Sequence, residues 1–157
     1  MLTYAIDEER VFLVTDEAYE KLLTFVQKGN ENERGGVLLG KVTRDYNAVY
    51  VTDISTPSKF DKSGRYYFIR SNGPAQKKIN EEWEKSNGEV NYIGEWHTHP
   101  VAHLIPSSDD KDLLNKNLHI NECPFDELFM IIVGIDGSLY VGHRDKDRFK
   151  ELKQREE

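Results

Sequence analysis

The chain has 157 residues, 38% of them hydrophobic and 31% charged, which suits one globular domain that buries a full core without disulfides. Its single cysteine, Cys123, excludes a disulfide framework and a zinc site built from several cysteines, and no apolar run approaches the roughly 20 residues of a membrane span. A formal net charge of −7 argues against binding to nucleic acid or to anionic membranes, so we expect a protein partner. The N-terminus shows no signal-peptide pattern, so we expect a cytoplasmic protein.

The first half of the chain predicts short strands around one amphipathic helix. Thr15 is placed to cap this helix, and Gly29 is placed to stop it. The predicted elements are strands at 3–6 and 10–14, a helix over 16–29, and strands at 35–43, 48–56 and 65–71. The last three strands, separated by a turn and by the polar loop 57–64, predict an antiparallel meander.

The second half alternates helical and strand patterns. The predicted elements are a helix from Pro74 to Gly88, a strand at 91–99, a helix over 107–118, and a hairpin over 128–143 that turns at Asp136 and Gly137. Both tryptophans, Trp83 and Trp96, are expected in the core. Strands and helices mix without strict βαβ alternation, so the predicted fold class is α+β, a mixed sheet flanked by helices.

The C-terminal residues differ from the rest in composition. Residues 146–157 carry charges of both signs almost throughout, which predicts a solvated helix or a tail. We therefore place the domain at residues 1–145 and treat the charged segment as an appendage.

Two histidines one residue apart mark the predicted strand 91–99. Alternate residues of a strand share a face, so Glu95, His97 and His99 project together at steps of about 6.6 Å. Two imidazoles at this spacing can converge on one metal ion. Pro100 then ends the strand and frees the chain to turn back over the site.

A carboxylate follows at the start of the next predicted helix. Asp110 sits in its first turn, where a folded-back chain can bring it to a metal. Ser107 and Asp110 also have the spacing of a capping box, a pattern that occurs in many helices without any metal. Either interpretation accounts for these two residues taken alone.

Taken together, these residues predict a zinc site. His97, His99 and Asp110 supply two nitrogens and one oxygen, the three-ligand set that leaves zinc a fourth position for water, and imidazole favours zinc over magnesium or calcium. Hydrolysis at such a site also needs a base to carry a proton to the leaving amine. Glu95 and Glu33 are both candidates, and the pattern alone leaves the choice open.

At these residues the sequence resembles the JAB/MPN metallopeptidases, which carry the JAMM motif. In that motif a glutamate precedes a glycine-bearing strand, and His-x-His is followed after seven residues by Ser and after two more by Asp. Glu33 in ERGGVLLG, the HTHP at 97–100, Ser107 and Asp110 fill every position. The resemblance implies a single JAB/MPN domain with a curved mixed sheet, similar to the cytidine deaminases.

The resemblance also implies a role for each motif residue. His97, His99 and Asp110 would bind one zinc ion with water as the fourth ligand. Glu33 would act as general base and then as acid, and Ser107 would help to hold the oxyanion. The implied activity is that of a zinc metallopeptidase that cleaves isopeptide bonds.

Glu95 departs from many eukaryotic members, in which an aromatic residue is expected two positions before the first histidine. The form GEWHTHP at 94–100 resembles the bacterial branch, particularly the small JAB proteins encoded with E1- and E2-like proteins in CBASS anti-phage operons. This implies removal of a cGAS-like nucleotidyltransferase from a target lysine or from an E1–E2 fusion protein. Two alternatives stay open: processing or removal of a bacterial ubiquitin-like modifier, and a non-catalytic binding module of the same fold.

The sequence identifies no substrate-binding residues. An isopeptidase must align a narrow C-terminal tail, and pairing that tail with a sheet edge supplies hydrogen bonds without demanding much sequence. Loop 57–65 is considered as a border of the cleft that holds this tail.

Overall fold

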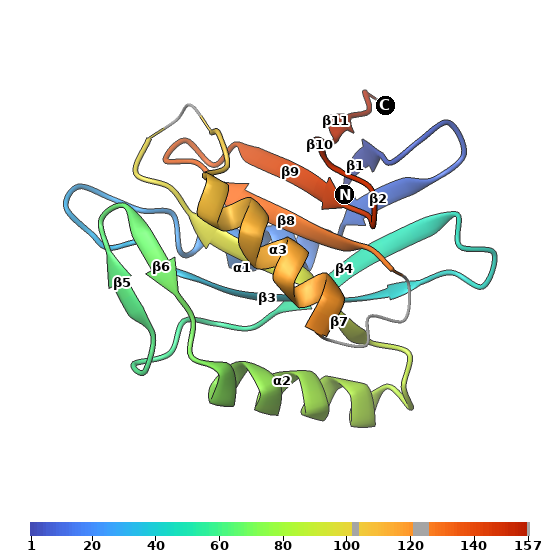
Figure 1. The fold of residues 1–157 in the computed structure, drawn as a ribbon, viewed down its shortest axis with the longest axis horizontal. Coiled ribbons are helices and arrows are strands. Elements are labelled where there is room, and N and C mark those ends of the chain that lie inside the picture. Colours follow the sequence, from blue (N-terminus) through green and yellow to red (C-terminus); the bar gives the residue numbers. More distant parts are fainter. Residues whose placement is uncertain (102–103, 121–125, 157) are drawn as a thin grey trace.

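The computed structural model describes residues 1–101, 104–120 and 126–156. Within these residues a nine-stranded mixed sheet is flanked by three helices, and a small separate hairpin stands beside it (Figure 1). The α+β prediction is therefore confirmed. His103 and Cys123 lie outside the described residues.

The elements are as follows. The large sheet contains β1 (Leu2–Ala5), β2 (Val11–Val14), β3 (Gly35–Val42), β4 (Ala48–Ile54), β7 (Asn91–Thr98), β8 (Leu128–Val133), β9 (Leu139–Arg144), β10 (Phe149–Glu151) and β11 (Lys153–Gln154). The separate hairpin consists of β5 (Lys62–Gly64) and β6 (Tyr67–Ile69). The helices are α1 (Asp16–Leu23), α2 (Asn72–Lys85) and α3 (Ser108–Ile120).

The large sheet curves until its two edges meet. Its strand order is β10-β9-β8-β7-β3-β4-β2-β1-β11, with β7 between β3 and β8, and with parallel pairs only at β2–β4 and β7–β8 among the described strands. The edge strands β10 and β11 are separated by Leu152 alone. The Leu152 N–H donates to the carbonyl of Val141 on β9 at 2.8 Å, and its side chain is buried in the core. A single residue thus connects opposite ends of the sheet.

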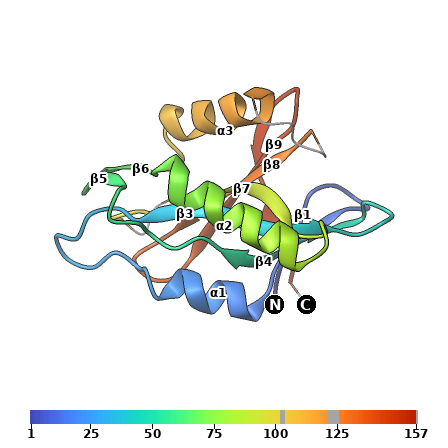
Figure 2. The same cartoon turned by 90° about the horizontal axis from the view of Figure 1, so that it is seen from below.

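Both faces of β8 are covered, which explains its unbroken apolar sequence LFMIIV. Figure 2 shows α1 and α3 on opposite sides of the sheet. Phe129, Ile131 and Val133 belong to the main core cluster, which includes residues of α1. The alternate residues Leu128, Met130 and Ile132 pack with Leu114 of α3.

Several local predictions are confirmed. The Thr15 hydroxyl accepts the Ala18 N–H at 3.2 Å and caps α1. Gly137 has φ of 81° in the turn between β8 and β9, a conformation that favours glycine. Trp96 is buried as expected.

Other predictions are wrong. The meander does not form, because the predicted strand 65–71 pairs as β6 with β5, from the predicted loop, and not with β4. Helix α1 ends at Leu23, well before Gly29. Trp83 is 54% exposed, and Ala75 is the residue of α2 that is buried.

The charged C-terminal segment is a correction of its own. Its described residues, 146–156, form no helix: residues 149–151 pair with β9, and residues 153–154 pair with β1. In FKELKQ, Leu152 is buried between the exposed Glu151 and Lys153, and Phe149 packs against the cluster around Leu114, so two apolar residues among many charges decide the conformation.

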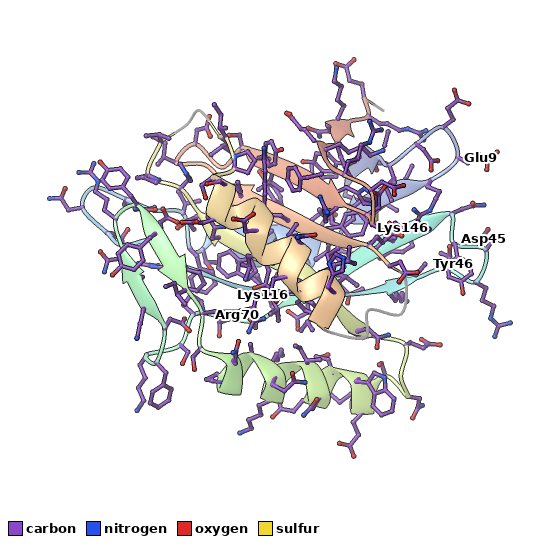
Figure 3. All side chains as sticks on the ribbon, viewed as in Figure 1. Glu9, Asp45, Tyr46, Arg70, Lys116 and Lys146 are labelled. Atoms are coloured by element: carbon purple, nitrogen blue, oxygen red, sulfur yellow. The ribbon has the colours of Figure 1, made fainter. Side chains whose placement is uncertain are left out.

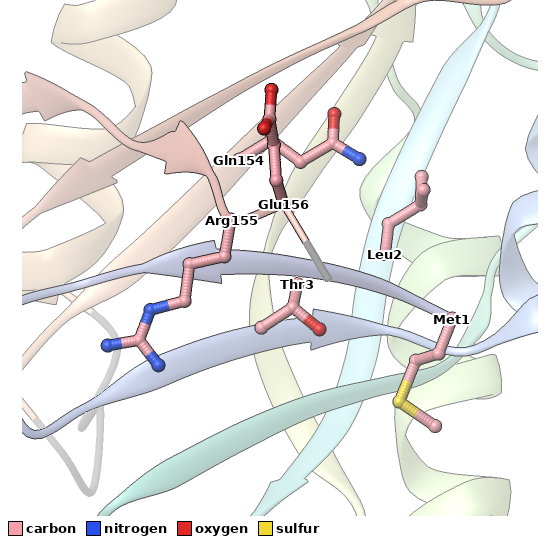
Figure 4. A pocket seen from close by; sticks show the side chains of 6 residues that line it. All are labelled: Met1, Leu2, Thr3, Gln154, Arg155 and Glu156. Carbon is pink, nitrogen blue, oxygen red and sulfur yellow. The ribbon is translucent and has the colours of Figure 1, made fainter.

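In the described part of the chain, no helix has the length and apolarity needed to cross a membrane. A shallow hollow of about 550 Å³ lies where β1 pairs with β11 (Figure 4). Met1, Leu2, Thr3, Gln154, Arg155 and Glu156 line it. It shares no lining residue with the larger cleft described next.

Candidate active site

Neighbouring strands bring the predicted base and the histidines together. Strands β3 and β7 are antiparallel, with Gly35 opposite His97. The Thr98 N–H donates to the Arg34 carbonyl at 2.8 Å, which continues the pairing beyond β3. Glu33, next to Arg34, therefore lies beside the end of β7 that carries His97 and His99.

Gly35 permits a close approach at this point. A Cβ atom there would lie 2.4 Å from the carbonyl oxygen of Trp96 and 2.7 Å from the ring of Phe68 on β6. Real Cβ atoms do not come this near, so a side chain at residue 35 would push the hairpin away from the strand that carries the histidines.

Two predicted metal donors have the spacing of ligands to one ion. His97 Nε2 and Asp110 Oδ2 are 3.5 Å apart. Zinc bonds of about 2.0–2.2 Å in a tetrahedron place neighbouring ligand atoms roughly 3.4 Å apart. The His97 and His99 ring centroids are 6.3 Å apart, and His99 Nδ1 is buried without a hydrogen-bond partner among the described residues. A nitrogen in that condition is suited to a ligand that the protein itself does not supply.

Burial prepares both imidazoles for metal binding. It lowers the pKa of His97 and of His99, although the negative charge of Asp110 opposes the effect. Both rings are therefore neutral near pH 7, the form that binds a metal. In residues 1–101, 104–120 and 126–156, however, no three His, Cys, Asp or Glu side chains already form a closed metal-binding group.

The capping box is real, and it coexists with the contact to His97. The Ser107 N–H donates to Asp110 Oδ2 at 2.8 Å, and the Asp110 N–H donates to Ser107 Oγ at 3.1 Å. The same Asp110 oxygen faces His97. The cap thus fixes the carboxylate in place, and the Ser107 hydroxyl keeps its own hydrogen for another acceptor.

Glu33 is a buried carboxyl with a strongly shifted pKa. Its side chain is 4% exposed, and burial, followed by the charge of Asp110, raises its pKa to about 8. The structure gives its carboxyl no hydrogen bond or ion pair with any described residue, whereas its backbone N–H donates to Gly64 at 2.8 Å. A carboxyl that titrates close to neutral pH can both take up and release a proton.

Glu95 is engaged elsewhere. It is buried, its Oε1 accepts from Arg70 Nε at 2.6 Å, and its Oε2 accepts from the Tyr92 hydroxyl at 2.5 Å. Tyr92 in turn accepts from Asn117 of α3 at 3.1 Å. The carboxylate that shares a strand face with the histidines thus anchors the end of β6 to β7.

One cleft of about 900 Å³ brings the motif residues together. It contains all the predicted site residues: Glu33, Glu95, His97, His99, Ser107 and Asp110. Figure 3 labels Arg70 and Lys116, which line it from the base of the hairpin and from α3.

Much of this cleft had no signal in the sequence. The hairpin contributes residues 66–70 to the lining, whereas none of loop 57–65 belongs to it. Polar side chains of α2, β7 and α3 also line it, namely Asn72, Gln76, Asn91, Tyr92, Lys116 and Asn117. Their separation along the chain hides their proximity.

Comparison with known proteins places this geometry in context. Residues 15–148 match the family described as prokaryotic homologs of the JAB domain. A relative from Escherichia coli (strain TW11681) is 29% identical over 155 residues, 98% of this chain and 95% of its own length. A Vibrio cholerae relative is 28% identical, with 93% and 90% covered, and one from Pseudomonas aeruginosa is 30% identical, with 74% and 73% covered.

All three relatives are named CD-NTase/cGAS isopeptidase. Among solved structures, the solution structure of a Desulfitobacterium hafniense protein matches with a TM-score of 0.59 at 21% identity. The match covers 89% of this chain and 88% of that one, and it shows a shared fold.

Proposed function

The chain belongs to the prokaryotic homologs of the JAB domain, and we propose that it is a zinc-dependent isopeptidase. The observation that carries the proposal is the group at one end of the cleft. Asp110 lies 3.5 Å from His97, His99 has a buried nitrogen without a partner among described residues, and the buried carboxyl of Glu33 beside them has a raised pKa.

His97, His99 and Asp110 would hold the ion. Bound zinc supplies a Lewis acid that polarises a carbonyl and lowers the pKa of water. The donor set fits zinc in kind, because two neutral imidazoles and one carboxylate leave one position open. The capping box would keep Asp110 in its orientation with or without the ion.

The chain's own groups would carry the proton and the developing charge. Glu33 takes a proton from the attacking water and delivers it to the nitrogen of the scissile bond. The C–N bond then breaks, the lysine leaves as a neutral amine, and the carbonyl re-forms as a carboxyl group. The Ser107 hydroxyl donates toward the oxyanion that forms at the scissile carbonyl. A nearby cation favours the ionised form of Glu33, which the base needs before each cycle.

For the substrate we propose a cGAS-like nucleotidyltransferase joined through its extended C-terminal tail to a lysine or to an E1–E2-like fusion protein. The names of the relatives support this choice. The reaction would take place in the cytoplasm as part of anti-phage defence.

Metal removal tests the proposal. Purified protein is expected to hold about one zinc per chain and to cleave a model conjugate in which the nucleotidyltransferase tail is linked to a lysine side chain. Chelation should stop cleavage and added zinc should restore it. His97→Ala should lose the metal, whereas His119→Ala, on α3 outside the cleft lining, should keep it. Full cleavage by metal-free protein would contradict the proposal.

A further inference from the structure

A buried glutamine connects the segments that form the site. Gln27 follows α1, and its side chain is 2% exposed. Its Nε2 donates to the Glu31 carbonyl at 2.7 Å and to the Arg65 carbonyl at 3.1 Å. Its Oε1 accepts from the hydroxyl of Thr98 at 3.2 Å. One amide thus contacts the segment before β3, the turn between β5 and β6, and the end of β7.

Thr98 makes the connection specific. It is the middle residue of the His-Thr-His sequence and is fully buried. Its Oγ1 accepts the Arg34 N–H at 3.0 Å, and its own N–H donates to the Arg34 carbonyl at 2.8 Å. Both the backbone N–H and the backbone carbonyl of Arg34 therefore bond to Thr98, the residue that separates the two histidines.

Glu33 lies inside this arrangement. Gln27 holds the carbonyl two residues before it, and Thr98 holds the amide of the residue after it. The Glu33 N–H itself donates to Gly64, next to the Arg65 carbonyl that Gln27 also holds. The backbone at Glu33 is thus fixed relative to β7 by contacts with Thr98 and Gly64, and the Gln27 side chain bonds to Thr98 and to the residue after Gly64.

We infer that Gln27, acting through Thr98, is a positioning residue that sets the location of the Glu33 carboxyl relative to His97 and His99. The inference rests on the proposed function, in which Glu33 carries the proton. A displacement of about 1 Å at a reacting group can lower a rate by about 100-fold. A buried amide with all its contacts satisfied holds one arrangement more firmly than apolar packing does.

The experiment compares Gln27→Met and Thr98→Val with a control of the same chemistry. Thr15→Val also removes a hydroxyl that donates to one group and accepts from another, since Thr15 Oγ1 donates to Val51 at 3.0 Å and accepts from Ala18 at 3.2 Å. Thr15 caps α1 and does not line the cleft. All three variants lose buried or half-buried hydrogen bonds, so all three should lose stability.

Only the first two should lose turnover. We expect kcat for the model conjugate to fall about 10- to 100-fold in Gln27→Met and Thr98→Val, with KM and zinc content near those of the unaltered chain. Thr98→Ser, which keeps the hydroxyl, should recover most of the kcat. Thr15→Val should retain kcat. An unchanged kcat in Gln27→Met would overturn the inference, as would an equal loss in Thr15→Val.

A second measurement does not depend on activity. In zinc-free protein the Glu33 amide should exchange its hydrogen at least about 10-fold faster in Gln27→Met than in the unaltered chain, while the Ala18 amide should not change. Equal exchange at Glu33 would overturn the inference even in an active enzyme. Absence of cleavage by the zinc-loaded, unaltered chain would contradict the proposed function, and the exchange rates would still decide whether Gln27 positions Glu33.

Discussion

Glu33→Gln is expected to lower kcat for isopeptide cleavage by about 10²- to 10⁴-fold, the usual contribution of a general acid–base group. The amide keeps the size of the side chain but cannot take the proton of the attacking water. Bound zinc should remain at the level of the unaltered chain, because the proposed ligands are His97, His99 and Asp110. Single-turnover cleavage together with metal analysis measures both quantities.

The matched comparison is Glu95→Gln. It alters a buried carboxylate of the same cleft that already accepts from Arg70 and Tyr92. A smaller effect on the chemical step is expected there. Retained activity in Glu33→Gln together with lost activity in folded Glu95→Gln would assign the base to Glu95 instead.

The same Glu33→Gln substitution should stabilise the zinc-free protein. Burial raises the pKa of Glu33 from its ordinary value of 4.5 to about 8, so the stability associated with its proton is present below pH 4.5 and is lost as the pH rises from there through 8. Glutamine has no proton to lose. We expect Glu33→Gln to raise the free energy of unfolding by about 4 kcal/mol at pH 8 and to have little effect at pH 4. Urea denaturation at both pH values checks this, and an equal effect at both would contradict it.

The second large effect is expected at the buried ion pair. Arg70→Met should lower the free energy of unfolding by about 3–5 kcal/mol, because it leaves the Glu95 carboxylate buried without its cation. The Tyr92 hydroxyl would still donate to Glu95, but it carries no charge. Chemical denaturation at pH 7 measures the loss.

Two controls define the cause of that loss. Replacing both partners, Arg70→Met with Glu95→Met, should recover much of the stability, because an apolar pair needs no charge compensation. Lys85→Met removes a cation that is 73% exposed and 3.9 Å from Glu82, and it should change stability by no more than about 0.5 kcal/mol. A double variant as unstable as Arg70→Met alone would show that the loss comes from packing and not from the unpaired carboxylate.

The sequence was informative where neighbouring residues decide the structure. The Thr15 cap and the turn at Gly137 depend on side chains and φ values within a few residues, and both were predicted. The strand that pairs with β6 was not predicted, because alternation identifies a strand but does not identify its neighbour in the sheet. The prediction for residues 146–157 is wrong for a related reason. Charged residues dominate their sequence pattern, whereas the burial of Leu152 depends on its contact with β9, which lies elsewhere in the sequence.

The site shows the same division. The match over residues 15–148 confirms the resemblance seen in the motif, and the cleft brings all its residues together. The capping and metal-ligand interpretations of Asp110 competed in the sequence but are compatible in space, since one oxygen serves the cap and faces His97. The ion pair that engages Glu95 could not be predicted, because its partner Arg70 lies far from Glu95 in sequence.

The single-residue connection at Leu152 has a consequence for synthesis on the ribosome. Strands β1 and β9 acquire their outer partners only when residues 149–154 have emerged, so a nascent chain presents two unpaired strand edges until then. A chain cut before Phe149 would retain Glu33, His97, His99 and Asp110 but would leave those edges open to other chains. Such a fragment would be lost to aggregation although every residue of the proposed chemistry is present.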